Sequence, residues 1–170
     1  MTRPIYIGLG SNVGDRLGFL DSAVKELSEL SASKVVGMSS VYETEPYGNK
    51  DQPEFLNMTV ELESSLEPNE LLLALKSIEA KLGRHRTERW GPREIDLDLL
   101  YYGKHVVNQK KLQVPHPEVG LRRFVLVPLN EIGHSFIDPV IRKNIAELLA
   151  ECTDTGVVRK TELTTRLQEH

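Results

Sequence analysis

The alternation of apolar and polar residues predicts a mixed series of strands and helices. Residues 5–9 form a short apolar run that ends in a glycine- and asparagine-containing turn, as a strand entering a turn does. From Leu17 to Leu27, apolar residues then recur at helical spacing. Asp15 stands just before them and is suited to cap this helix. The chain therefore opens with a strand followed by an amphipathic helix.

Two further strands and a second helix follow. Residues 34–45 carry several β-branched side chains, and residues 56–62 alternate between apolar and polar ones. The loop at 48–53 joins these two segments, so we expect them to pair antiparallel. Apolar residues at helical spacing from Pro68 to Leu82 predict the second helix, which Gly83 is suited to end.

The remaining predicted elements are a strand over 94–102, a short partner strand at 106–107, and helices over 123–132 and 144–152. The polar stretch 153–170 has no assignment. The order β-α-β-β-α-β predicts an α+β fold with a ferredoxin-like, split βαβ core, an antiparallel sheet and C-terminal helical additions. We expect one domain over residues 1–170.

Composition narrows the class of protein. The chain has 170 residues, of which 39% are hydrophobic and 27% charged, as in a globular domain. Its net charge of −4 argues against a general nucleic-acid binder. Cys152 is the only cysteine, and no long apolar run or signal-peptide layout is present. We therefore expect a cytoplasmic protein that does not enter membranes.

The sharpest chemical signal is the pair Asp96 and Asp98. Alternate residues of a strand share a face, so both carboxylates point the same way, with Cα atoms about 6.8 Å apart. Two charges at that separation repel by roughly 2.4 kcal/mol at an effective dielectric constant near 20. A divalent cation removes this cost, and oxygen ligands suit Mg²⁺. The alternative is a solvated strand face.

Arginines gather just before that pair, between Arg84 and Arg93. A guanidinium matches phosphate oxygens in shape and keeps its charge at any working pH. Arginines beside metal-binding carboxylates indicate a triphosphate site, although a solvated basic loop is the competing interpretation. Trp90 lies inside this polar run and could stack on a planar ring or anchor the loop.

Other candidates are weaker. His116 stands between two prolines and could donate to a phosphate, or be a simple turn histidine. Phe55 and Asn57 share a strand face, where they could stack on and hydrogen-bond to a flat heterocycle. The glycines between Gly8 and Gly14 do not have the spacing of a dinucleotide loop, and we interpret them as easing a strand-to-helix turn.

Taken together, these segments resemble the 6-hydroxymethyl-7,8-dihydropterin pyrophosphokinases of folate biosynthesis. The resemblance runs from Ile5 to about Leu149. It rests on the segments 10–12 (GSN), 42–48 (YETEPYG), 51–57 (DQPEFLN), 89–98 (RWGPREIDLD) and 114–117 (VPHP).

The resemblance implies an enzyme that transfers the β,γ-pyrophosphoryl group of ATP to the hydroxymethyl oxygen of the pterin and releases AMP. It implies two Mg²⁺ ions held by Asp96 and Asp98, which with Arg84 and Arg93 form the catalytic set. The implied pterin-binding residues are Thr44, Pro46, Tyr47, Phe55, Asn57, Trp90 and Phe124. The implied ATP-binding residues are Glu79, Arg86, Arg89, His116 and Arg122.

A second hypothesis from the residues is a non-catalytic ligand-binding or RNA-binding domain of ferredoxin-like fold. RNA recognition of that kind needs aromatic side chains on the sheet and a basic surface. This chain has 6% aromatic residues and an acidic balance. We therefore expect small-molecule substrates, ATP and the pterin, with no nucleic-acid partner, and a monomer.

Overall fold

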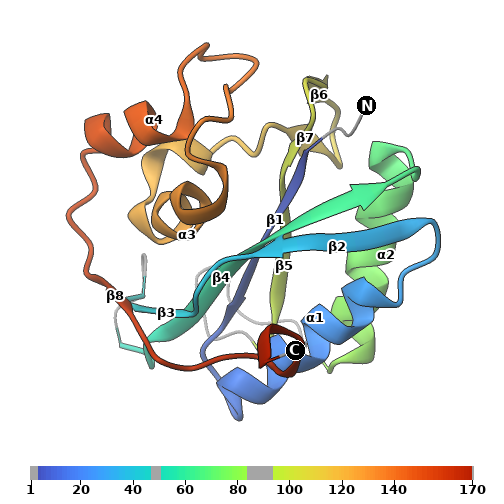
Figure 1. Ribbon diagram of the computed structural model, residues 1–170, viewed down its shortest axis with the longest axis vertical. Coiled ribbons are helices and arrows are strands. Elements are labelled where there is room, and N and C mark those ends of the chain that lie inside the picture. Colours follow the sequence, from blue (N-terminus) through green and yellow to red (C-terminus); the bar gives the residue numbers. More distant parts are fainter. Residues whose placement is uncertain (1–3, 47–50, 84–93, 170) are drawn as a thin grey trace.

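A computed structural model describes residues 4–46, 51–83 and 94–169 of the chain (Figure 1). Its strands are β1 (Ile5–Ser11), β2 (Ser33–Met38), β3 (Tyr42–Thr44), β4 (Phe55–Ser64), β5 (Asp96–Tyr102), β6 (Val107–Asn108), β7 (Gln113–Val114) and β8 (Val158–Lys160). Its helices are α1 (Arg16–Ser28), α2 (Pro68–Lys81), α3 (Arg123–Gly133) and α4 (Ile145–Glu151), with short 3-10 turns at Val119–Leu121 and Arg166–Glu169.

The main sheet has the strand order β5-β1-β4-β3-β8, and β2 also pairs with β4. The pairings are antiparallel. With β2 and β3 standing together for the second predicted strand, β1 to β5 follow the predicted order β-α-β-β-α-β, so the α+β fold with a ferredoxin-like core is confirmed. Because β1 lies between β4 and β5, residues far apart in the sequence meet along its two edges.

Helices cover both faces of the sheet (Figure 1). On one face, Ile5, Ile7 and Leu9 of β1 pack with the buried apolar residues of α1 and α2. On the other face, Tyr6 packs with the buried residues of α3 and α4. This division follows the two-residue period of a strand. Among the described residues, no helix is long and apolar enough to cross a membrane.

The helix ends match their sequence signals. The carboxylate of Asp15 accepts from Gly18 N at 3.0 Å, as expected of the cap of α1. Pro68 begins α2, and Gly83 follows it with φ +90°, a conformation that glycine adopts without strain. Asn144 caps α4 by accepting from Glu147 N.

Three strand predictions need correction. The single strand expected over 34–45 is two, because the chain bends between Met38 and Tyr42, where the Ser39 hydroxyl accepts from Thr59 N. The strand expected from Glu94 begins at Asp96. The short strand near 107 pairs with β7 in a separate two-stranded sheet rather than with β5. These three features depend on contacts with residues far away in the chain, which the pattern of a single segment does not indicate.

The polar stretch that had no assignment is ordered against the sheet. Within it, β8 pairs with β3 and extends the main sheet by one strand. Further on, Thr165 is buried and Gln168 donates to Ser39 O at 2.7 Å. This segment therefore packs beside the bend between β2 and β3.

Candidate functional site

The candidate site is a row of residues across three strands, on the face that α3 covers in part. Gly10 of β1 pairs with Asn57 of β4 on one side and with Asp96 of β5 on the other. Gly8 pairs with Asp98 in the same way. Neighbouring strands lie about 4.8 Å apart, so Asp96 and Asn57 flank Gly10 at a mutual separation of roughly 10 Å.

Gly10 keeps the middle of this row open. A Cβ atom added there would lie 2.5 Å from Asn57 Oδ1 and 3.6 Å from Phe55 Cδ2. One added at Gly8 would make ordinary contact with Leu100, at 3.5 Å. The interpretation of these glycines as turn residues was wrong for both, which lie inside β1; only Gly14, with φ +72°, serves the turn.

Asp96 and Asp98 alternate with buried leucines along β5. Leu97 and Leu99 face the core under α1 and α2. The two aspartates therefore share the opposite face, where Asp96 is half-buried and Asp98 exposed. Glu79 of α2 accepts from Leu97 N at 2.8 Å and so anchors the strand between the two carboxylates.

Thr44, Phe55 and Asn57 form the other end of the row. Asn57 Nδ2 donates to Thr44 Oγ1 at 2.6 Å, and both residues are buried. This bond turns the Asn57 carbonyl oxygen toward the space above Gly10, where the ring of Phe55 also lies. The predicted pairing of Phe55 and Asn57 on one face is confirmed. Pro46 is buried just beyond Thr44.

His116 and Arg122 lie in the connection between β7 and α3, and Phe124 is the second residue of α3. Glu118 N donates to His116 Nδ1 at 3.2 Å, so a neutral ring carries its proton on Nε2. Burial lowers the pKa of His116 below its usual value; the Glu118 carboxylate opposes this effect and the Arg122 guanidinium adds to it. The imidazole is therefore a neutral donor at pH 7. The Arg122 guanidinium pairs with Glu118 and lies 5.8 Å from the centre of the Phe124 ring.

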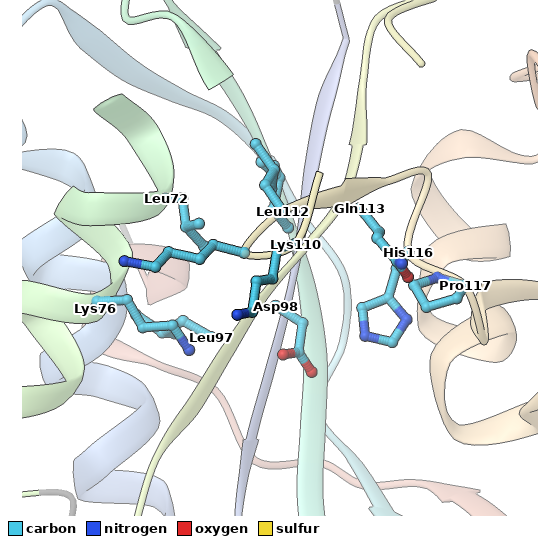
Figure 2. Close-up of a pocket in the computed structure, with 11 residues that line it drawn as sticks. Leu72, Lys76, Leu97, Asp98, Lys110, Leu112, Gln113, His116 and Pro117 are labelled. Atoms are coloured by element: carbon cyan, nitrogen blue, oxygen red, sulfur yellow. The ribbon is translucent and has the colours of Figure 1, made fainter. Parts of the chain in front are cut away.

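Asp98 and His116 line a common pocket of about 250 Å³ (Figure 2). Figure 2 shows the Asp98 carboxylate between His116 on one side and the side chains of Lys76 and Lys110 on the other. The two lysines were not predicted as site residues. Lys76 lies five residues before the end of α2, and Lys110 lies in the short β6–β7 loop, so only the tertiary fold brings them together. In the sequence, the adjacent lysines 110 and 111 were the one indication that positive charge gathers at this pocket.

Comparison with known proteins decides the family. The model of the family 7,8-dihydro-6-hydroxymethylpterin-pyrophosphokinase (HPPK) matches residues 6–134. The chain belongs to this family. It is therefore an enzyme of pyrophosphoryl transfer in folate biosynthesis, and the non-catalytic binding domain considered above was the wrong alternative.

Several HPPK relatives are similar over most of their length. The chain is 42% identical to the 2-amino-4-hydroxy-6-hydroxymethyldihydropteridine pyrophosphokinase of Aquifex aeolicus over 149 residues, covering 88% of this chain and 92% of the relative. It is 49% identical to the protein of that name from Bacillus subtilis over 132 residues, covering 78% and 79%.

Solved structures support the HPPK fold at lower identity. The wild-type Plasmodium falciparum HPPK-DHPS structure superposes with a TM-score of 0.69 at 15% identity. The alignment covers 89% of this chain and 45% of that one, so the chain spans less than half of the solved protein. A second structure of that protein, the A437G form, gives a TM-score of 0.71. At this identity the likeness concerns the fold alone.

Part of the expected HPPK site lies outside the described residues. These positions are Tyr47, Arg84, Arg86, Arg89, Trp90 and Arg93. The structure does bring together Asp96, Asp98, Thr44, Phe55 and Asn57 on one sheet face. The roles expected of individual residues, including Glu79, His116, Arg122 and Phe124, stay predictions.

The donor set suits Mg²⁺. Within the described ranges, no group of three or more histidine, cysteine, aspartate or glutamate side chains is arranged to hold a metal. Asp96 and Asp98 thus offer two carboxylates on an accessible face, not a closed protein cage. Mg²⁺ is typically held by one or two carboxylates, with phosphates and waters completing its octahedron.

Proposed function

We propose that this chain transfers the β,γ-pyrophosphoryl group of ATP to the hydroxymethyl oxygen of 6-hydroxymethyl-7,8-dihydropterin, yielding the pterin diphosphate and AMP. The observation that supports the proposal is the row Asp96–Gly10–Asn57, which has a carboxylate suited to the phosphate side and an amide suited to the heterocycle side on one open sheet face. Roughly 10 Å between its ends leaves room for an acceptor ring and its reacting alcohol.

On the acceptor side, the chain's own groups suit a flat, hydrogen-bonding heterocycle. Phe55 offers a ring face for stacking, and the Asn57 carbonyl oxygen is aimed over Gly10, where it could accept from a ring N–H. The bond from Asn57 to Thr44 holds the amide in that orientation. Phe124, in the first turn of α3, would supply the second ring face, as the family resemblance implies.

On the donor side, the pocket of Asp98 and His116 would receive the nucleotide and its phosphates. His116 Nε2–H would donate to a phosphate oxygen, because Nδ1 is already engaged by Glu118 N. The ammonium groups of Lys76 and Lys110 add positive charge to the same pocket. Mg²⁺, two ions by the family resemblance, would neutralise charge on the transferred group when held by Asp96, Asp98 and the phosphates.

The transfer requires no covalent bond between the protein and the transferred group. The hydroxymethyl oxygen forms a bond to the β-phosphorus, the bond from that phosphorus to the α,β-bridging oxygen breaks, and AMP leaves with that oxygen. The alcohol proton passes to solvent. A loose transition state needs no strong base, so alignment of acceptor and donor along the row carries the rate.

We also propose an oligomeric state and a location for the enzyme. The described site residues come from one chain, so a monomer would suffice for catalysis. A monomeric, cytoplasmic enzyme without a nucleic-acid partner is what we propose. Sedimentation of the purified chain at micromolar concentration tests the first point: a species of twice the 19.2 kDa chain mass would contradict it.

An AMP-release assay tests the function. The chain is incubated with ATP, the hydroxymethylpterin and MgCl₂, and three parallel reactions each omit the pterin, the magnesium or the protein. We expect AMP in the complete reaction alone. AMP release that is independent of the pterin would indicate a hydrolase, and ADP in place of AMP would indicate a simple kinase; either result would overturn the proposal.

A further inference from the structure

The segment between α4 and the end of β8 connects two elements that carry the expected acceptor residues. Asp154 accepts from Arg123 N, at the first residue of α3 and next to Phe124. Arg123 Nε donates to Gly156 O at 3.2 Å. A few residues later, β8 pairs with β3, where Val158 lies opposite Thr44. The segment thus spans from one expected wall of the acceptor site to the other.

Arg159, in the middle of β8, bridges two carboxylates. Its Nη2 atom lies 3.1 Å from Glu43 Oε1 and 2.6 Å from Glu54 Oε2. Glu43 is also bonded to Arg16 of α1, whose Nη1 donates to Glu43 Oε2 at 3.0 Å and to Glu54 O at 2.9 Å. Two arginines and two glutamates therefore form one continuous network, which we call the Arg159 network.

The network lies directly behind the acceptor residues. Glu43 precedes Thr44 in β3, and Glu54 immediately precedes Phe55 at the start of β4. Since alternate residues of a strand face opposite sides, Glu43 holds β3 from the face opposite to Thr44. Arg159 thereby joins β3 to the residue before β4 at the point where Thr44 pairs with Phe55.

Charge sharing makes this network more than an isolated surface pair. A single exposed ion pair contributes little, but Glu43 is shared by two guanidiniums and its side chain is 29% exposed. The hydrogen bond from Arg159 lowers the pKa of Glu43, with Arg16 contributing in the same direction. Arg16, Glu43 and Glu54 also line an open cavity of about 530 Å³, through which salt can reach them.

We propose that Arg159 is a positioning residue for the acceptor: through Glu43 and Glu54 it holds Thr44 and Phe55 in the geometry that binds the pterin. Arg159 does not itself touch the acceptor face. The inference rests on the proposed function, since it concerns the pterin side of the same site. It assigns a role to a segment that had no predicted structure.

Arg159→Ala and Lys160→Ala form a matched pair for the test. Both remove one positive charge from an exposed position of β8, but Lys160, being the next residue, points to the opposite face of the strand. For Arg159→Ala we expect KM for the pterin to rise roughly three- to tenfold, with KM for ATP unchanged. For Lys160→Ala we expect wild-type values of both. Equal effects of the two variants would overturn the proposal.

Further variants separate positioning from folding. Glu54→Gln weakens the same network while Arg159 stays in place. Because both substitutions act on one network, the double variant should raise the pterin KM by less than the product of the two single effects. Arg159→Lys should restore part of the affinity. If Arg159→Ala proves too unstable to assay, the Glu54→Gln and Arg159→Lys variants decide: wild-type pterin KM in both overturns the proposal.

Salt gives an independent readout. Raising NaCl should weaken pterin binding to the wild type more than to Arg159→Ala, as measured by equilibrium fluorescence titration. Identical salt dependence would count against the network. These outcomes are distinct from a failure of the proposed function, which would appear as a wild-type chain that releases no AMP.

Discussion

Gly10 is the residue at which space on the sheet face matters most. A methyl group there would collide with the Asn57 carbonyl oxygen, which the bond to Thr44 holds in place. For Gly10→Ala we expect pterin affinity to fall about tenfold or more, the equivalent of ~1.4 kcal/mol. Gly8→Ala is the matched control, because its new methyl group would make only ordinary contact with Leu100. Titration of the pterin, followed by fluorescence, measures both; equal affinities would disprove the steric argument.

Asp98 carries the strongest prediction at this scale. Asp98→Asn keeps the size of the side chain but removes the charge that would hold Mg²⁺. We expect kcat for AMP release to fall by roughly 100-fold or more at saturating Mg²⁺. Circular dichroism should remain that of the wild type, since Asp98 is exposed. A variant with near wild-type kcat would exclude Asp98 as a metal ligand.

The lowered pKa of His116 predicts how the free energy of unfolding depends on pH. Its pKa is lowered in the folded chain, so between that value and the ordinary 6.5 the unfolded chain binds more protons. The free energy of unfolding should therefore fall as pH drops below about 6.5. His116→Asn lacks this titration and should lose less stability between pH 7.5 and pH 5.5. Urea unfolding at both values measures the difference; parallel losses in the two proteins would contradict the prediction.

Site residues that neighbour each other within one strand could be predicted from the sequence. Residues whose place depends on contacts between distant segments could not. The two-residue period of a strand placed Asp96 with Asp98, and Phe55 with Asn57, because it depends on local geometry alone. Lys110 follows a two-residue strand and Arg159 lies in a three-residue strand, and such short strands carry too few residues for a periodic signal. Their positions depend on pairing partners distant in the chain.

At the scale of elements, the contact between α2 and β5 fixes the position of the strand that carries Asp96 and Asp98. Glu79 is buried and accepts from Leu97 N, the residue between the two aspartates. For Glu79→Ala we expect a loss of about 1–3 kcal/mol in unfolding free energy, because the Leu97 N–H loses its acceptor inside the core. Urea unfolding measures the loss, and wild-type stability would contradict it.

Glu79→Gln separates this structural role from the ATP-binding role that the family resemblance implies. The glutamine retains a carbonyl oxygen for Leu97 N, so we expect most of the stability to be kept. If Glu79 also contacts the nucleotide, KM for ATP should rise in this variant while stability does not change. An unchanged KM would confine Glu79 to anchoring β5.

Elements with long, regular patterns were predicted well, and breaks in a pattern were not. The helical periods of α1 and α2 continue for more than ten residues, so their buried faces follow from sequence. The alternation in β4 predicts one buried face, but residues 56–60 are buried on both. The bend that divides 33–44 into β2 and β3 depends on Ser39 and on Glu131 of α3, which accepts from Ser40 N and Tyr42 OH. That contact spans about ninety residues of the chain and has no local signature.

At the scale of the whole molecule, the position of β1 produces the site. Because β1 lies between β4 and β5, its two glycines form an open strip with the expected acceptor residues on one edge and the carboxylates on the other. The helices α3 and α4 cover another part of that face, where they pack on Tyr6 and Leu100 (Figure 1). The strand order of a ferredoxin-like fold thus joins two half-sites that are about forty residues apart in sequence.

The most direct test of the central claim is the identity of the transferred group. ³¹P NMR of a reaction containing the chain, ATP, Mg²⁺ and 6-hydroxymethyl-7,8-dihydropterin distinguishes the products without any coupling enzyme. Transfer across the Asp96–Gly10–Asn57 row predicts AMP and a pterin diphosphate ester in equal amounts, and formation of both products slowed by roughly 100-fold or more in the Asp98→Asn variant. ADP with a pterin monophosphate, or AMP with free pyrophosphate, would contradict it.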